Sequence, residues 1–376
     1  MQRILVTGAA GFIGSHVVDQ LVEAGYEVMG FDALDPQVHH GEPAYLNNNC
    51  EYVWGDIRNR ELMAHLLRGV DAVSHQAAAV GVGQSMYEVE HYTDVNTRGT
   101  AVLLDLLTTD AIDIEKLIVA SSMSIYGEGA YYCPQCEERI YPGNRNRDQL
   151  EDRNWQHQCP KCNGELSPRA TNEQKPLRPT SIYAQTKRHQ EEMSLLIGRT
   201  YDIPTLALRY FNVYGSRQSL DNPYTGVCAI FSSRIKNGNP PIIYEDGRQK
   251  RDFVHVSDIA RANILALQAE DVAPQAVNIG TGDAITVRDI AERLLAEYGE
   301  CGDVTPRFPG QYRQGDIRHC YADISRAQDV LGYAPETDFQ DGMRGLVEWA
   351  DKVDATDHFD EAQQELEDKG LVGGEA

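Results

Sequence analysis

Residues 3–14 read RILVTGAAGFIG, a short apolar run that leads directly into a glycine-rich turn. Apolar residues then recur at helical spacing over 11–24. A strand that turns through glycines into a helix offers free backbone N–H groups and the positive end of the helix dipole to an anion. Gly8, Gly11 and Gly14 can also be purely structural. In the context described below, their GxxGxxG spacing predicts a site for a dinucleotide pyrophosphate.

Strand and helix patterns continue to alternate after this turn. Apolar runs of strand length occur at residues 27–31, 52–54, 72–75, 117–121 and 205–210. Helical spacing occurs at 89–107, 181–200, 257–269, 286–298 and 339–353. Alternation of this kind predicts an α/β fold, in which a doubly wound parallel sheet carries helices on both faces. The later helices predict a smaller C-terminal lobe.

The alternation of strand and helix patterns stops at Gly127 and resumes after about Thr171. The intervening stretch is polar and rich in Asn, Arg, Pro and Cys. This break predicts an insertion between two parts of one domain. We expect a cofactor-binding domain at 1–128 and 170–215, an insertion at 129–169, a substrate-binding lobe at 216–350 that partly returns to the first domain, and an acidic tail at 351–376.

The charge of the chain excludes several kinds of partner. With 57 acidic against 34 basic residues the formal net charge is −23, so a broadly basic surface for nucleic acid or an anionic membrane is not expected. No apolar run reaches 18 residues and no signal peptide is apparent, which predicts a cytoplasmic protein without a membrane span. The tail holds nine of the acids and two lysines, and we expect it to be a solvated end.

Acidic residues follow two of the predicted strands. Asp32 lies 18 residues after Gly14, where a carboxylate can accept hydrogen bonds from both ribose hydroxyls of NAD. The same charge repels the additional phosphate of NADP, so NAD is the expected cofactor. Asp56 is a candidate for the adenine edge.

Tyr183 and Lys187 are four residues apart and therefore share one face of a helix. A tyrosine with an ordinary pKa near 10 is a poor base at neutral pH. A nearby ammonium, together with a positive nicotinamide, would lower that pKa and favour the phenolate. Tyrosine and lysine at this spacing are common by chance. The pair indicates a catalytic site only in combination with Ser121 and Ser122, which end the strand at 117–121.

Four cysteines form two CxxC pairs within the insertion, Cys133 with Cys136 and Cys159 with Cys162. Two such pairs predict a tetrahedral zinc site that protein ligands close completely, so that the metal is structural. The insertion can be a rim or lid over the substrate, an oligomer contact, or a decorated loop without effect on turnover. A zinc-ribbon module that binds nucleic acid is a further possibility. Five basic residues favour it, namely Arg145, Arg147, Arg153, Lys161 and Arg169. Six acidic residues offset their charge, at positions 137, 138, 148, 151, 152 and 165.

A series of motifs in one order resembles the extended short-chain dehydrogenase/reductase family, and within it the nucleotide-sugar epimerases and dehydratases, the 4-epimerases above all. The motifs are TGAAGFIG (7–14), Asp32, Asp56–Ile57, HQAA (75–78), VNTRGT (95–100), SSMSIYG (121–127), YAQTK (183–187), LRYFNVYG (208–215) and RDFVHVSDIARA (251–262). The resemblance runs from Met1 to about Ala350 and is interrupted by the insertion, which departs from the family pattern.

The resemblance implies a Rossmann fold, NAD and a nucleotide-diphosphate sugar as substrate. It implies Tyr183 as catalytic base, Lys187 as its tuner and ribose ligand, and Ser122 as hydroxyl partner of the sugar. The implied cofactor-binding residues are Gly8, Gly11, Phe12, Ile13, Gly14, Asp32, Asp56, Ile57, Ala77, Asn96, Tyr183 and Lys187. The implied substrate-binding residues are Ser122, Ser124, Asn212, Arg251, Arg313, Asp316 and Cys320. Relatives dimerise through helices that correspond to 89–107 and 183–200, so a homodimer is expected.

Arginines suit the substrate because the guanidinium fork matches phosphate oxygens. The resemblance implies Asn212, Arg251 and Arg313 on the diphosphate and Asp316 on the nucleotide ribose. A surface ion pair is the alternative role for the two arginines.

The two residues that follow Ser122 help to distinguish between the reactions of the family. Family members that eliminate water carry an Asp-Glu pair there, and decarboxylating members usually carry a glutamate at the second position, whereas this chain has Met123 and Ser124. The expected reaction is therefore epimerisation at carbon 4 through a transient 4-keto sugar. A dehydratase, a decarboxylase, a net dehydrogenase and a non-catalytic NAD-binding regulator remain alternatives. In similar epimerases the position of Cys320 borders the sugar, and a small residue there would admit N-acetylhexosamines; a buried small hydrophobe is the other interpretation.

Overall fold

The computed structural model describes residues 2–109, 112–299 and 304–374. Its centre is a seven-stranded sheet, in which every neighbouring pair is parallel. The strands, in their order across the sheet, are β3 (Glu51–Trp54), β2 (Glu27–Asp32), β1 (Arg3–Thr7), β4 (Ala72–His75), β5 (Lys116–Ser122), β9 (Thr205–Tyr210) and β13 (Gln275–Ile279). The predicted doubly wound parallel sheet is confirmed.

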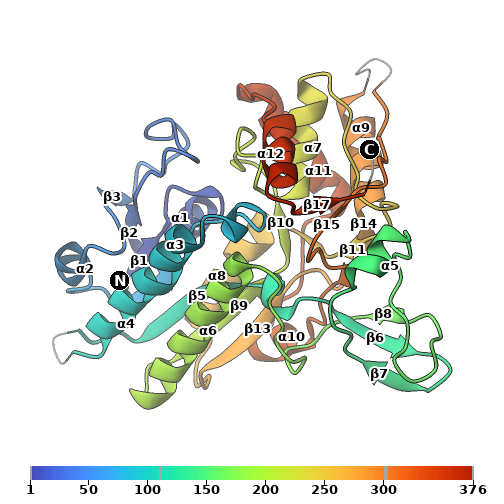
Figure 1. Ribbon diagram of the computed structural model, residues 1–376. Helices are drawn as coiled ribbons and strands as arrows, with labels where there is room; N and C mark the ends of the chain where they lie inside the picture. The colour runs from blue at the N-terminus through green and yellow to red at the C-terminus, as the bar shows by residue number, and fades with distance from the viewer. Residues whose placement is uncertain (1, 110–111, 300–303, 375–376) are drawn as a thin grey trace.

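Alternate side chains of β1 enter two different cores, as a strand buried on both faces requires. Ile4 and Val6 pack with residues of α1 (Phe12–Glu23) and α8 (Val256–Gln268). Leu5 packs on the opposite face with residues of α2 (Arg60–Leu66) and α4 (Gly99–Leu107). The long α6 (Ile182–Thr200) contacts β5, β9 and α4. Figure 1 shows α4 and α6 in front of the sheet and α8 behind it.

The helix expected at 89–107 is interrupted. It consists of α3 (Val89–Tyr92), a π-helical turn η2 (Thr93–Arg98) and α4. The π-turn buries Asn96, whose amide group bonds the backbone of Ala79 in both directions and donates to Thr186 of α6 at 3.0 Å. Widened turns of this kind are frequent at functional sites, and this one joins a loop after β4 to α6.

The C-terminal lobe has its own core between three helices, α7 (Val227–Lys236), α9 (Val287–Tyr298) and α11 (Phe339–Lys352). Two small sheets join it to the rest of the chain. They are β10 (Asn212–Tyr214) with β12 (Phe253–His255), and β11 (Lys250–Arg251) between β14 (Ile285–Thr286) and β16 (His319–Cys320). The chain returns to the main sheet through β13, against which α10 (Ser325–Leu331) packs.

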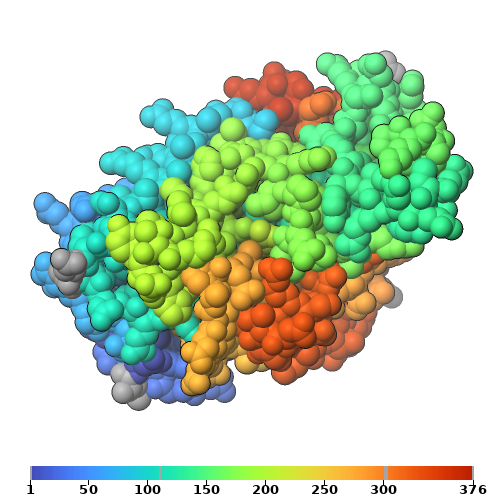
Figure 2. Space-filling model, turned by 90° about the horizontal axis from the view of Figure 1, so that it is seen from below, coloured from blue at the N-terminus to red at the C-terminus, as the bar shows by residue number. Residues whose placement is uncertain are grey.

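The insertion forms a small antiparallel sheet of β7 (Glu138–Ile140), β6 (Ala130–Cys133) and β8 (Ser167–Arg169). A one-turn helix, α5 (Arg147–Glu151), lies in its long loop. The insertion begins shortly after η3 (Met123–Tyr126). Seen from below, the insertion is a distinct bulge at one end of the molecule, beside the C-terminal lobe (Figure 2).

The described part of the acidic tail, residues 351–374, contains regular elements that pack on the protein, so the expectation of a solvated end is wrong for this part. Residues Phe359–Asp368 form α12, which lies beside α7 (Figure 1), and β17 (Val372–Gly373) pairs antiparallel with β15 (Tyr312–Arg313). The apolar Ala362 and Leu366 recur four residues apart and are buried, so the helix is amphipathic despite its charge. Among the described residues, no helix is both long and apolar enough to cross a membrane.

Candidate active site

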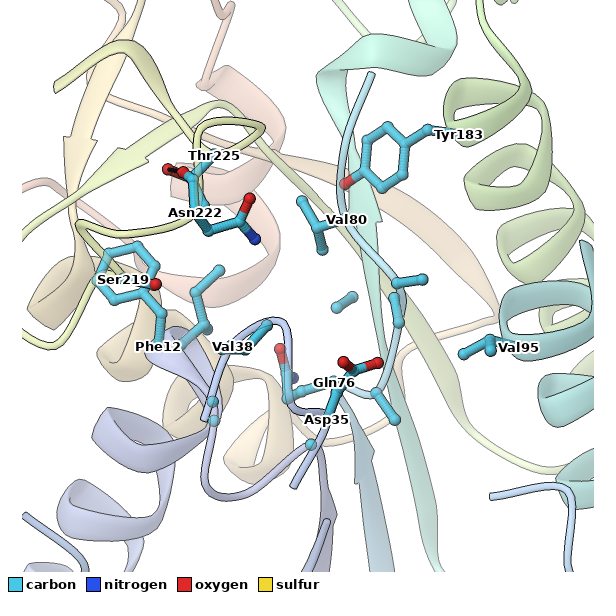
Figure 3. A pocket seen from close by; sticks show the side chains of 18 of the residues that line it. Phe12, Asp35, Val38, Gln76, Val80, Val95, Tyr183, Ser219, Asn222 and Thr225 are labelled. Atoms are coloured by element: carbon cyan, nitrogen blue, oxygen red, sulfur yellow. Dashed lines mark hydrogen bonds between the residues drawn. The ribbon is translucent and has the colours of Figure 1, made fainter. Parts of the chain in front are cut away.

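A cavity of about 440 Å³ opens where the strands β1, β2, β4 and β5 end (Figure 3). Crevices at the carboxyl ends of parallel strands are the usual ligand sites of doubly wound sheets. Thirteen of the predicted site residues line it, namely Gly8, Gly11, Phe12, Ile13, Gly14, Asp32, Asp56, Ile57, Ala77, Ser122, Tyr183, Lys187 and Asn212.

The glycine turn needs its glycines for reasons of space. Gly8 has φ +70°, and a Cβ there would approach the backbone nitrogen of Ala77 to 2.8 Å. A Cβ on Gly14 would lie 1.9 Å from the carbonyl oxygen of Gly8. Gly11 precedes α1 with no side-chain cap, so the first N–H groups of the helix face the cavity end of the turn. The turn therefore has the close packing and the free donors that a pyrophosphate requires.

Two carboxylates stand beside this turn. Asp32 accepts from the N–H groups of Ala10 at 2.9 Å and Leu34 at 2.8 Å, which fixes it between the turn and the loop after β2. Asp56 binds Arg58 through both carboxylate oxygens, and the hydrogen bond from Arg58 is the main reason why the pKa of Asp56 is lowered. Both side chains are thus held in place on the cavity wall.

Ser122, Tyr183 and Lys187 meet on one wall of the cavity. Ser122 ends β5, and its hydroxyl oxygen accepts from the Ser124 hydroxyl at 2.9 Å. Tyr183 and Lys187 occupy the first turns of α6, which Ser181 caps by accepting from the Ala184 N–H. Figure 3 shows the Tyr183 hydroxyl directed toward the cavity, on the opposite side from Asn222 and Thr225.

Burial controls the titration of this pair. It raises the pKa of Tyr183 to about 12, and hydrogen bonding to Ser122 acts in the opposite direction. Burial lowers the pKa of Lys187 to about 7, against the attraction of the Glu191 carboxylate. In the protein alone, desolvation of the phenolate is the main cause of the raised pKa of Tyr183, and the expected lowering of this pKa by the Lys187 ammonium together with a positive nicotinamide remains a prediction. An added positive charge beside the phenolate is needed to reverse the shift.

Several cavity residues were missed by sequence reasoning. The loop between β10 and α7 contributes Gln218, Ser219, Asn222 and Thr225, and Ser85 accepts a hydrogen bond from the Tyr183 N–H at 2.9 Å. The buried Oδ1 of Asn212 and Oε1 of Gln218 have no hydrogen-bond partner among the residues that the structure describes. The only available signal was a polar stretch, RQSLDNPYTG (217–226), at the carboxyl end of a strand.

The other predicted residues lie outside this cavity. Arg313 and Asp316 form an ion pair at 3.0 Å. Both line a smaller cavity, to which Leu366 and Leu371 of the C-terminal tail also contribute. The guanidinium of Arg251 donates to three main-chain carbonyls, those of Lys250, Ile317 and Arg318. The substrate role of these charged residues remains a prediction.

Three further predicted site residues contact other protein groups and do not line the cavity. Asn96 is buried behind the loop after β4 and does not line the cavity, and Ser124 donates to Ser122. Cys320 lies in the hydrophobic core with its thiol 3.8 Å from the Thr171 hydroxyl. The cavity thus gives no support to a sugar pocket bordered by Cys320, and access for N-acetyl groups remains a prediction.

The four cysteines of the insertion form a compact cluster. Their sulfur atoms all lie within 4.8 Å of one another, with Cys133 and Cys162 3.5 Å apart and Cys136 and Cys159 3.8 Å apart. Tetrahedral zinc with Zn–S bonds of about 2.3 Å requires S–S separations of about 3.8 Å. The N–H groups of Cys136 and Lys161 point at the sulfurs of Cys133 and Cys159, a pattern that favours thiolates. The donor set therefore fits zinc.

Comparison with known proteins agrees with this geometry. A model of the NAD dependent epimerase/dehydratase family matches residues 4–147 and 158–280, and the chain belongs to this family. The unmatched residues between these two parts lie within the insertion.

Individual relatives are similar over nearly their whole length. A dTDP-L-rhamnose 4-epimerase of Burkholderia thailandensis is 34% identical over 352 residues, which are 93% of this chain and 94% of that protein. A UDP-glucose 4-epimerase of Thermotoga maritima, solved with UDP-glucose, superposes with a TM-score of 0.75 at 31% identity and covers 93% of this chain and 99% of its own. A UDP-glucose 4-epimerase of Thermus thermophilus, solved with NAD, has a TM-score of 0.72 at 30% identity, with 94% and 100% covered.

Proposed function

We propose that this protein is an NAD-dependent epimerase that inverts carbon 4 of a nucleotide-diphosphate sugar. The observation that carries the proposal is the position of Ser122, Tyr183 and Lys187 on the wall of the cavity that the glycine turn also lines. The 4-epimerases among its relatives support the reaction. Their names differ in both nucleotide and sugar, so the substrate is defined here only as a class.

The cofactor would be held by the glycine turn, Asp32 and Lys187, with Asp56 near the adenine. When bound, NAD supplies a hydride acceptor at carbon 4 and a hydride donor for the return step. Its positive nicotinamide is also the added charge that would lower the pKa of Tyr183.

The protein's own groups move the proton. The Tyr183 phenolate takes the proton of the 4-hydroxyl as the C–H bond at carbon 4 breaks, and Ser122 donates a hydrogen bond to the developing ketone. The Ser124 hydroxyl keeps Ser122 oriented for this by donating to it. The keto sugar turns about its diphosphate anchor, and Tyr183 returns the proton when hydride adds to the other face.

Product analysis tests this proposal against its alternatives. The purified protein is incubated with UDP-glucose, UDP-N-acetylglucosamine and dTDP-L-rhamnose, and the sugars are identified. Interconversion at carbon 4 without accumulation of NADH is expected. A dehydrated or decarboxylated product, or NADH that accumulates with turnover, would assign another reaction on the same scaffold. Binding of NAD without any turnover would indicate a regulator. Full activity in Tyr183→Phe would contradict the proposed base.

The cysteine cluster is proposed as a structural Zn²⁺ site. Four protein thiolates fill a tetrahedral shell, so no position remains open for substrate or water. The segment around the cluster has a small core of its own, of which Tyr131, Leu166 and the cysteines are the main part. Metal binding would then contribute folding free energy to the insertion. A site of four thiolates also suits a reducing compartment, which supports a cytoplasmic location.

The assembly is proposed to be a homodimer through α3, α4 and α6. The helices α3 and α6 pack side by side, and each exposes a large apolar side chain, Val89 at 46% and Leu196 at 58%. Apolar side chains on adjacent helices are a suitable centre for a symmetric helix-to-helix interface.

A further inference from the structure

The side of the insertion that faces the C-terminal lobe carries a buried arginine, Arg145. Its guanidinium donates to Glu245 Oε1 at 2.8 Å, to the main-chain oxygen of Asp316 at 2.9 Å and to that of Trp155 at 3.2 Å. Only 1% of the side chain is exposed. Arg145 is therefore turned toward protein acceptors and is not part of a basic surface for nucleic acid.

The Asp316 carbonyl belongs to a tight turn. The Asp316 N–H donates to the Arg313 carbonyl at 3.2 Å, and the two side chains form an ion pair across the turn. Both line the smaller cavity together with Ser181, which precedes Tyr183 by two residues. The Arg313 guanidinium lies 4.9 Å from the ring centre of Tyr244. The turn thus presents a cation, a carboxylate and an aromatic ring next to the catalytic helix.

The backbone after this turn is held from the same side. Glu128, where the insertion begins, accepts from the N–H groups of Arg318 at 2.6 Å and His319 at 3.3 Å. Arg251 donates to the carbonyls of Ile317 and Arg318. Every peptide group from 316 to 319 therefore has at least one bond to Glu128, Arg145 or Arg251, the first two of which flank or belong to the insertion.

These contacts form one buried charge network. Glu245 lies between Arg145 and Arg318, and Arg318 also binds both carboxylate oxygens of Asp246. Glu128 completes the network with Arg145 at 4.0 Å. A buried charge is stable only while its partners remain in place. Loss of Arg145 would leave the Glu245 carboxylate with a single cation and the Asp316 carbonyl without its donor.

Arg145 lies in a loop that the cysteine cluster closes. The loop between Cys136 and Cys159 starts and ends at the cluster and carries Arg145 and Trp155, whose ring centre lies 6.4 Å from that of Tyr312. Closing the ends of a flexible loop removes much of its conformational freedom. A metal bound at the cluster would therefore favour the position of the loop against residues 312–319.

We propose that the insertion is a brace for the nucleotide subsite, in which Arg145 is a positioning residue that holds the Arg313–Asp316 turn ready for a nucleoside diphosphate. The inference rests on the proposed function, which places the nucleotide at this turn. It assigns the insertion an internal role, distinct from that of a lid over the sugar.

The test compares Arg145→Met with Arg147→Met in the full-length, metal- and NAD-containing protein. Arg147 belongs to the same loop, but its side chain is exposed and has Glu151 as its main partner, with a weaker contact to Tyr312. Calorimetric titration with UDP and with dTDP gives a Kd that does not depend on turnover, and steady-state kinetics give kcat and KM. We expect Arg145→Met to raise Kd and KM about tenfold, with kcat within about twofold and the NAD content unchanged, because the displaced turn binds nucleotide and not the reacting carbon. Arg147→Met should behave as wild type.

The outcomes separate the brace from a purely structural role and from failure of the proposed function. A Kd within twofold of wild type, or a parallel loss of kcat and NAD content, overturns the brace. If Arg145→Met does not yield folded protein, Arg145→Lys replaces it. Lysine lacks the guanidinium fork, of which one end donates to the Trp155 carbonyl and the other to Glu245 and the Asp316 carbonyl. Kd should therefore rise at least threefold, and an unchanged Kd overturns the brace. A rise in Kd without turnover of any tested sugar retains the brace and rejects the epimerase. Wild-type protein that binds neither UDP nor dTDP rejects both.

Discussion

The carboxylate of Glu365 in α12 accepts a hydrogen bond from the hydroxyl of Tyr87 at 2.9 Å, across 278 residues of chain. The same carboxylate oxygen accepts from Tyr224 at 2.7 Å. Tyr87 follows the loop that supports Tyr183 through Ser85, and Tyr224 belongs to the cavity loop before α7. The C-terminal segment therefore connects both sides of the cavity mouth, and β17 pairs with β15, which leads into the Arg313–Asp316 turn.

Truncation after His358 should lower stability and weaken substrate binding together. Leu366 is buried against Gly83, and removal of a buried leucine side chain costs about 2–5 kcal/mol. Without β17, the strand that carries Arg313 loses its partner, so KM for the nucleotide sugar should rise while NAD content is retained. Urea denaturation and steady-state kinetics measure both effects. The single change Glu365→Ala should cost less than about 1 kcal/mol, because its bonds are exposed. Stability equal to wild type in the truncated chain would show that α12 does not pack in solution.

Gly14→Ala should destabilise the protein even without ligand. The new Cβ would lie 1.9 Å from the Gly8 carbonyl oxygen, which is backbone and cannot move away without distorting the turn. We expect a loss of roughly 1–3 kcal/mol in the free energy of unfolding and loss of bound NAD. Gly11→Ala is the matched control, since its Cβ would have a nearest contact of 3.3 Å at a negative φ. The stability of that variant should stay near wild type. Equal stability of both variants would contradict the close approach in the turn.

Much of this site could be predicted because its residues are fixed by local geometry. The glycine turn, the strand-end position of Ser122 and the helical spacing of Tyr183 and Lys187 each depend on a few consecutive residues, and the cavity includes all of them. The sheet followed from strand runs that are apolar on both faces. Asp32 and Asp56 could be predicted because each comes at or just after the end of a strand, β2 and β3 respectively.

The features that could not be predicted from the sequence depend on contacts between segments far apart in the chain. The motif around Asn96 predicts a cofactor ligand, whereas a π-turn, which has no sequence signature of its own, directs this side chain to the Ala79 backbone. The acidic composition of the tail predicts a solvated end, because a single buried residue such as Leu366, between Glu365 and Glu367, gives little apolar signal. Arg145 could not be distinguished from Arg147 without knowing that Glu245, a hundred residues later, faces only the first of them.

Lys187→Met should impair catalysis most strongly near neutral pH. Burial places the pKa of Tyr183 at about 12 and that of Lys187 at about 7, so ammonium and phenolate support each other only while Lys187 is protonated. Removal of this cation disfavours the phenolate, and kcat at pH 6.5, below the pKa of Lys187, should fall about 100-fold. Because the remaining base is a tyrosine with a raised pKa, kcat of the variant should continue to rise with pH up to the limit of stability. A variant whose pH profile has the wild-type shape would exclude Lys187 as the group that tunes Tyr183.

Leu196→Glu should convert the proposed dimer to a monomer. The side chain is 58% exposed on α6 in the single chain, and a buried unpaired carboxylate at a helix interface is strongly unfavourable. Light scattering after gel filtration measures the mass. Phe308→Glu is the control, an exposed aromatic residue in the other lobe, and should leave the mass unchanged. A monomeric wild type, or a Leu196→Glu variant that remains dimeric, would place the interface elsewhere or exclude it.

Protein purified without added metal should contain about one zinc per chain, as measured by atomic emission. Cys159→Ser should lower this content, because its sulfur lies 3.8 Å from that of Cys136 within the four-thiol cluster. The half-exposed Cys50 is remote from the cluster, so Cys50→Ser should retain the metal. Removal of zinc by a chelator should lower the thermal midpoint and raise KM, whereas kcat should change little because a closed Cys₄ shell has no open position for chemistry. Zinc content in Cys159→Ser equal to wild type, or a loss of kcat that metal removal causes before any change in KM, would contradict a structural site that acts through the insertion.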